Sequence, residues 1–137
     1  NPLETTVFFS RLIFDGMLDR FPNLKFCGAH GGGFLPSYLG RTDVACDVRP
    51  GANCANKKHP REYFKQQIFC DTLVFTNEGL RHLVAEVGSG QVVLGTDAPG
   101  DWDVDAVDFV LRAPGLSNAN RRAILGGTAQ KLLRISG

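Results

Sequence analysis

The residue in this sequence best suited to proton or metal chemistry is His30. It follows directly on the apolar run 24–29 and precedes Gly31, Gly32 and Gly33. A histidine in that place suits a general base or a metal ligand, because glycines let backbone and substrate approach closely. The alternative is a histidine that bonds a carbonyl group in a tight turn. The preceding apolar run and the three glycines favour the functional interpretation.

Two further side chains could act with it. Asp97 follows the valine-rich run 92–96, where a carboxylate can bind a divalent metal or orient a metal-bound water. Capping of the next turn is the alternative, and the residue alone does not separate the two. Arg41 can clamp a substrate carboxylate with paired hydrogen bonds. A single arginine at a helix end more often only complements the helix dipole.

Two familiar motifs are excluded. His30 and its glycines match the oxyanion loop of esterases, but that site requires a G-x-S-x-G nucleophile, and neither Ser89 nor Ser117 has both glycines. The dinucleotide motif G-x-G-x-x-G fails as well, since His30 stands two residues after Gly28. Neither esterase chemistry nor dinucleotide binding follows from this loop.

The other polar groups are interpreted as structural. Asp71 either supports the floor of a pocket or is a turn residue, and His59 and His82 are peripheral. Lys57 and Lys58 indicate a solvated loop. Four aspartates crowd one segment without calcium-loop spacing and indicate an exposed helix start; they are Asp101, Asp103, Asp105 and Asp108.

The four cysteines lack the C-x-x-C pairs of structural zinc sites; they are Cys27, Cys46, Cys54 and Cys70. A disulfide is not excluded by the sequence. Because no secretion signal is visible, we expect reduced thiols in the cytoplasm.

The elements that must position these residues alternate between strand and helix. Apolar patterning predicts strands at 24–29, 67–72 and 92–96. It predicts helices at 6–21, 35–44, 61–67, 78–87, 104–111 and 119–125. Alternation of this kind predicts an α/β fold with parallel strands. His30 and Asp97 then fall at the carboxyl ends of strands, where such folds carry their chemistry.

The number of strands bears on domain organisation. Three strands cannot close a barrel, and a (β/α)8 TIM barrel takes about 250 residues. We therefore expect residues 1–137 to be a C-terminal fragment of one barrel domain, comprising about its last three βα units. The absence of an initiating methionine before Asn1 favours the same interpretation.

Composition restricts the class of protein. Hydrophobic residues make up 43% and charged residues 21% of the chain, with a net charge of +1. These values are ordinary for a soluble globular domain. The scattered cations do not form a basic nucleic-acid surface, and no apolar run is long enough for a membrane span. We expect neither nucleic acid nor membrane as a partner.

Several segments, taken in order, resemble the C-terminal part of the amidohydrolase-related family that includes aminocarboxymuconate-semialdehyde decarboxylase. The resemblance covers essentially the whole chain. It rests on Asn1-Pro2-Leu3-Glu4-Thr5-Thr6, Phe21-Pro22, Ala29-His30-Gly31-Gly32-Gly33, Leu35-Pro36, Gly40-Arg41, Phe69-Cys70-Asp71-Thr72, Gly95-Thr96-Asp97 with Pro99, and Ile124-Leu125-Gly126-Gly127.

The resemblance implies a metal-dependent (β/α)8 barrel, often dimeric, that decarboxylates or hydrolyses small carboxylated substrates. In such enzymes zinc or a similar ion is held by an H-x-H pair, a further histidine and an aspartate, and Asp97 matches the aspartate. His30 matches a histidine that bonds the metal-bound water and helps deprotonate it. Arg41 matches an arginine that holds the substrate carboxylate in a neighbouring subunit's site, so a homodimer is expected.

The sequence departs from this pattern. It has no H-x-H pair and no histidine before His30, and Ala98 stands where many relatives have an aromatic residue. We expect this chain alone to bind metal weakly and to have no turnover. The leading hypothesis is a decarboxylase. Hydrolysis of a lactone or amide at the same site is an alternative, and so is an inactive half-barrel that acts only as an assembly module.

Overall fold

Three short strands form a parallel sheet in the computed structural model, which describes residues 1–100 and 104–135. The strands are β1 (Phe26–Gly28), β2 (Ile68–Asp71) and β3 (Val92–Val93), in the spatial order β1-β2-β3. Cys27 pairs with Phe69, and Cys70 pairs with Val92. The predicted α/β class and parallel pairing are confirmed.

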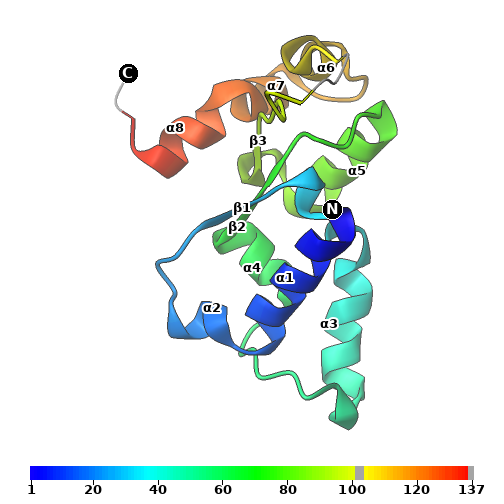
Figure 1. The fold of residues 1–137 in the computed structure, drawn as a ribbon, viewed down its shortest axis with the longest axis vertical. Helices are drawn as coiled ribbons and strands as arrows, with labels where there is room; N and C mark the ends of the chain where they lie inside the picture. Colours follow the sequence, from blue (N-terminus) through cyan, green and yellow to red (C-terminus); the bar gives the residue numbers. More distant parts are fainter. Residues whose placement is uncertain (101–103, 136–137) are drawn as a thin grey trace.

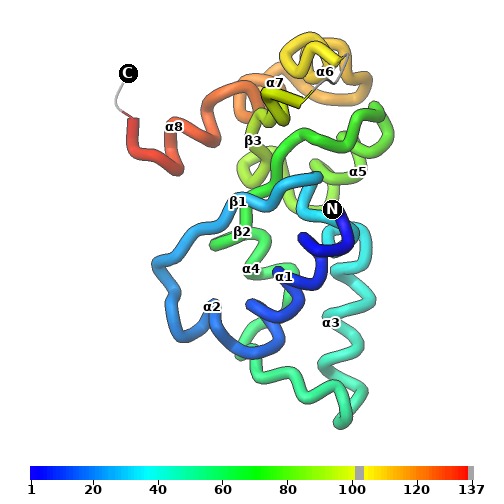
Figure 2. Tube along the Cα trace, viewed as in Figure 1, coloured from blue at the N-terminus to red at the C-terminus, as the bar shows by residue number. Residues whose placement is uncertain are grey.

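Helices precede, separate and follow the strands (Figure 1). They are α1 (Pro2–Phe14), α2 (Met17–Arg20), α3 (Leu39–Val48), α4 (Pro60–Gln66), α5 (Asn77–Val87), α6 (Ala106–Arg112), α7 (Asn118–Arg122) and α8 (Thr128–Leu133). Figure 2 traces the path from α1 and α2 through β1 and along α3, then back through α4 to β2. No helix within the described ranges is long and apolar enough to cross a membrane.

The core lies between the sheet and its helices. On β2, Ile68 and Cys70 are fully buried with Phe9 of α1 and Phe64 of α4. Phe69, which points to the other face, lines an open cavity of about 840 Å³. Because side chains alternate along a strand, this arrangement turns Asp71 to the same face as Phe69.

The predicted helix 6–21 is two helices. It starts earlier, at Pro2, a residue whose fixed φ suits the first turn. It breaks at Gly16, which has a φ of 70°. A Cβ at Gly16 would lie 3.1 Å from the Ala55 carbonyl oxygen. The break therefore reflects a contact with a distant loop, which periodicity does not reveal.

A buried glutamine holds the chain before β1. The side-chain amide of Gln67 is 1% exposed and donates to the carbonyls of Leu18 and Phe21 at 3.1 Å each and of Leu24 at 3.4 Å. The Phe21 carbonyl also accepts the N–H of Leu24 at 3.1 Å, so the amide adds to a turn that the backbone already closes. Gln67 thus fixes the turn that leads from α2 into the sheet.

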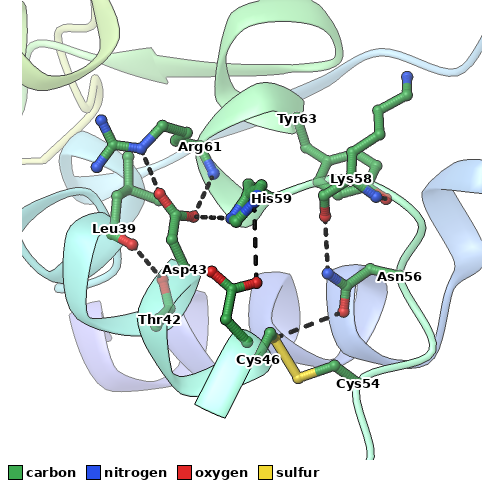
Figure 3. Close-up of polar contacts among 11 residues, drawn as sticks. Leu39, Thr42, Asp43, Cys46, Cys54, Asn56, Lys58, His59, Arg61 and Tyr63 are labelled. Atoms are coloured by element: carbon green, nitrogen blue, oxygen red, sulfur yellow. Dashed lines mark hydrogen bonds and ion pairs between the residues drawn. A yellow bond between two sulfur atoms is a disulfide. The ribbon is translucent and has the colours of Figure 1, made fainter.

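A disulfide joins Cys46 of α3 to Cys54 in the loop before α4 (Figure 3). This corrects the expectation of four reduced thiols; Cys27 and Cys70 are free. The same region holds a polar cluster in which buried Asp43 accepts hydrogen bonds from the backbone and side chain of Arg61. His59 lies between Asp43 and Asp47, at 4.0 and 3.9 Å, so it belongs to this peripheral cluster, as predicted.

Candidate functional site

The carboxyl ends of β1 and β2 are joined by Asp71. Its Oδ1 accepts hydrogen bonds from Gly31 N at 2.7 Å and Leu73 N at 3.1 Å, and its Oδ2 accepts one from His30 N at 3.2 Å. Burial raises the pKa of this carboxyl, while the three backbone donors act in the opposite direction. Asp71 therefore acts as the turn residue that was one of the two expectations for it, because it holds the turn that carries His30.

The turn at His30 has an unusual backbone. His30 has a φ of 58°, in the left-handed region that non-glycine residues rarely adopt. Gly33 has a φ of 70°, and a Cβ there would lie 2.5 Å from the Pro2 carbonyl oxygen. Gly33 is thus needed because the turn packs against the start of α1. The resulting loop presents His30 half-buried at the end of β1.

The first turn of α1 holds this loop through two threonines. Thr6 Oγ1 accepts the N–H of Phe34 at 2.8 Å, and Thr5 Oγ1 lies 3.1 Å from His30 Nδ1. Two of the segments quoted for the family resemblance, 1–6 and 29–33, are therefore in direct contact. Both segments form the turn that carries His30 and its support.

The carboxyl end of β3 is tied to β2 by Thr72. Its hydroxyl accepts from Gly95 N at 3.1 Å and lies 3.3 Å from Gly95 O. The predicted strand at 92–96 is therefore shorter in the structure. It ends at Val93, because the N–H and carbonyl groups of Gly95 are bonded to the Thr72 side chain instead of to a neighbouring strand. Asp97 follows, exposed, with a φ of 58°.

His30 and Asp97 thus both lie beyond the carboxyl ends of strands, at the same end of the sheet. Adjacent strands are about 4.8 Å apart, so β1 and β3, on either side of β2, are about 10 Å apart. A carboxylate is a suitable ligand for a divalent cation. Within residues 1–100 and 104–135, however, no three His, Cys, Asp or Glu side chains are grouped to hold a metal ion. The described chain therefore does not form a complete metal site.

Arg41 lies apart from these contacts. It is exposed on α3 and lines a groove of about 280 Å³ with Val44, Val48 and Arg49. Among the described contacts, no hydrogen bond or ion pair links Arg41 to His30. The structure therefore places His30 and Asp97 at the carboxyl-terminal end of the sheet and leaves Arg41 on α3, away from them.

Several other polar residues within the described ranges make local contacts. Asp105 caps α6 by accepting from Val107 N and Asp108 N at 2.9 Å each. Asp101 and Asp103 lie outside the described residues. His82 Nε2 is 3.1 Å from Ser37 Oγ. The roles of Thr5 and Thr6 were missed by residue-level reasoning, and the only sequence signal for them is the Asn1–Thr6 segment of the resemblance.

The chain is thus an α/β protein with a histidine and an aspartate beyond the carboxyl ends of parallel strands. The family model described as amidohydrolase matches residues 2–135, and the chain belongs to that family.

Its relatives include decarboxylases. The chain is 36% identical over 135 residues to 2-amino-3-carboxymuconate-6-semialdehyde decarboxylase of Dictyostelium discoideum, covering 96% of this chain and 37% of the relative. The structure of 5-carboxyvanillate decarboxylase from Sphingomonas paucimobilis matches with a TM-score of 0.88 and 30% identity, over 98% of this chain and 41% of that one.

A third similar protein carries ligands. Dihydroxybenzoic acid decarboxylase from Polaromonas sp. JS666, with bound manganese and the inhibitor 2-nitroresorcinol, matches with a TM-score of 0.86 and 27% identity. The match covers 98% of this chain and 41% of that one. The chain thus spans well under half the length of these three proteins.

Proposed function

We propose that residues 1–137 form the C-terminal part of a (β/α)8-barrel enzyme that decarboxylates a small carboxylated compound with the help of a divalent metal. The observation that carries the proposal is the position of His30, a titratable ring held at the carboxyl end of a parallel strand by Asp71 and Thr5. The decarboxylase relatives support the reaction class.

The reaction needs a group that handles a proton. Decarboxylation breaks the bond between a substrate carbon and its carboxylate, carbon dioxide leaves, and the electron pair stays on the substrate carbon. A proton must then reach that carbon. His30 is the group that holds and transfers it, since an imidazole changes protonation state near neutral pH.

Asp97 is the metal ligand that this chain contributes, and the ligands missing from the described residues come from the rest of the barrel. The metal, when bound, acts as a Lewis acid at the substrate's oxygen atoms. The zinc preference predicted from the resemblance stays a prediction. Manganese in the Polaromonas enzyme makes Mn²⁺ the second ion to test.

Arg41 binds the carboxylate of the substrate in the proposal, across the interface of a homodimer. Its exposure on α3 leaves it accessible to a second copy. The cytoplasmic location also stays a prediction. The Cys46–Cys54 disulfide weighs against it, because disulfides are rare in reducing compartments.

The test uses the complete protein that contains this chain. It is loaded with Mn²⁺ or Zn²⁺ and given hydroxylated benzoates and a carboxymuconate semialdehyde, and release of carbon dioxide is measured. We expect turnover with at least one of these substrates. His30→Ala should lower turnover by about 100-fold or more, the scale of general acid–base catalysis.

Metal content provides the control. His30→Ala should retain its bound metal, whereas Asp97→Ala should lose it together with activity. If His30→Ala loses metal, the histidine is a ligand and the proposed role is wrong. Incorporation of ¹⁸O from labelled water, without release of carbon dioxide, would identify the lactone or amide hydrolase instead.

A further inference from the structure

The contact between His30 and Thr5 bears on which ring nitrogen of His30 carries a hydrogen when the ring is neutral. Nδ1 of His30 lies 3.1 Å from Thr5 Oγ1, and either atom can supply the hydrogen when the imidazole is neutral. The answer decides the chemistry, because only the ring nitrogen without a hydrogen can accept a proton.

The hydroxyl hydrogen of Thr5 already has an acceptor. Thr5 Oγ1 donates to the Asn1 carbonyl oxygen, four residues back in α1, at 3.3 Å. A carbonyl oxygen only accepts, so the hydrogen in that bond belongs to the hydroxyl. A hydroxyl has a single hydrogen, so when that hydrogen is directed at the Asn1 carbonyl, Thr5 Oγ1 faces Nδ1 with a lone pair. In this arrangement the hydrogen between the two atoms is carried by Nδ1 of His30.

Thr6 shows the same arrangement with an unambiguous donor. Its hydroxyl donates to the Pro2 carbonyl oxygen, again four residues back, at 2.8 Å. Its oxygen then accepts the backbone N–H of Phe34 at 2.8 Å. Two adjacent hydroxyls in the first turn of α1 thus donate to their own helix. Thr6 accepts from the His30 loop, and the geometry gives Thr5 the same role.

We propose that Thr5 is a positioning residue that holds neutral His30 with its hydrogen on Nδ1, so that Nε2 is the atom that accepts and returns the proton. The proposal rests on the proposed function, in which His30 is the acid–base group. Thr5 accepts from Nδ1–H equally well when His30 is an imidazolium. A proton can therefore enter and leave at Nε2 without any rearrangement of Thr5.

The tautomer can be read directly in the complete protein. Its histidines are labelled with ¹⁵N, and long-range ¹H–¹⁵N correlations are recorded at a pH where the His30 ring is neutral. The His30 signals are assigned by their loss in His30→Ala. We expect the pattern of a ring protonated at Nδ1. A ring protonated at Nε2 would overturn the proposal, whether or not the protein decarboxylates anything, so this result is separate from a failure of the proposed function.

Variants test whether Thr5 is the cause. Thr5→Val removes the acceptor while keeping the shape, and should give a mixture of tautomers. It should also lower kcat by about 10- to 100-fold, because the ring loses its preferred tautomer and its orientation, an effect no larger than that of removing the acid–base group itself. Thr5→Ser should restore both the Nδ1–H tautomer and kcat.

Thr42→Val is the matched control, since the Thr42 hydroxyl donates to the Leu39 carbonyl within α3. It should leave the tautomer and kcat as in the unmodified protein. A Thr5→Val protein that keeps both would contradict the role of Thr5. If Thr5→Val does not fold, as judged by circular dichroism, the tautomer of the unmodified protein still decides the proposal.

Discussion

Asp71 is a buried carboxylate whose acceptor capacity is used by backbone groups of two segments, 30–31 and 73. An uncompensated buried carboxylate would be strongly unfavourable, and three donors offset part of its desolvation. The arrangement holds His30 in a left-handed conformation that a non-glycine residue otherwise avoids. The chemistry of His30 therefore depends on a side chain from the neighbouring strand.

We expect Asp71→Asn to lower the free energy of unfolding by about 1–3 kcal/mol, because an amide has one acceptor oxygen and leaves a buried N–H unpaired. Turnover should fall as well, since the His30 turn loses its support. Urea denaturation and steady-state kinetics measure the two effects. Asp15→Asn is the control, because Asp15 is exposed at the end of α1, and it should change neither quantity.

The pH dependence of stability should also distinguish this carboxyl. Its pKa in the folded protein is raised above the ordinary value of 3.8 by burial, so at pH values just above 3.8 the folded state binds more protons than the unfolded state. The contribution of Asp71 to stability is then largest below pH 3.8 and declines as pH rises through the raised pKa. The difference in unfolding free energy between the unmodified protein and Asp71→Asn should follow that decline, and an increase would contradict it.

Among the elements, α2 and α4 are connected by Tyr63. Its buried hydroxyl donates to Asp19 Oδ2 at 2.7 Å and accepts from Lys58 N at 3.2 Å. Asp19 Oδ2 also accepts from Lys57 N at 2.9 Å. This connection fastens the loop between the disulfide and α4 to the segment that precedes β1. Burial, followed by the bond to Asp19, raises the pKa of Tyr63 from 10 to about 12.

Tyr63→Phe should lower the unfolding free energy at pH 7 by about 1–3 kcal/mol, because the Lys58 N–H loses its acceptor. The raised pKa means that the stabilising contribution is complete below pH 10 and is lost as pH rises from 10 towards 12. Denaturation at pH 7, 9 and 11 should therefore show the gap between the two proteins shrinking at the highest pH. Tyr38→Phe, at a site where the side chain is exposed, should show little change at any of these values.

Local patterns predict the elements better than their ends. The apolar runs identified all three strands. The ends depend on partners far along the chain. Thr72 takes the backbone of Gly95 and shortens β3, and Ala55 packs against the break at Gly16. The positions of His30 and Asp97 followed from strand order, whereas the Thr5 contact depends on how α1 packs, which periodicity does not specify.

At the scale of the whole molecule, the proposed role of Arg41 in a second subunit predicts complementation between variants. We expect a mixture of equal amounts of the inactive variants His30→Ala and Arg41→Ala to regain about a quarter of full activity after subunit exchange. Half of the dimers in such a mixture carry both variants, and each of those has one intact site if Arg41 acts across the interface.

The outcome separates the two locations of Arg41. If Arg41 serves the site of its own subunit, each subunit of the mixed dimer has one defect, and the mixture stays inactive. Size-exclusion chromatography with light scattering establishes whether a dimer forms. Refolding the two variants separately and then combining them without exchange is the matched control.

The turn at His30 also has a consequence for how the protein folds. Its supporting contacts join residues 25, 40 and 41 positions apart in sequence, so no local segment forms the turn alone. Contacts of such separation form after the chain has closed large loops. We therefore expect the conformation of His30 to appear late in folding, once α1 and β2 have docked. Any partial opening that releases α1 should then abolish the geometry of His30 well before the remaining helices unfold.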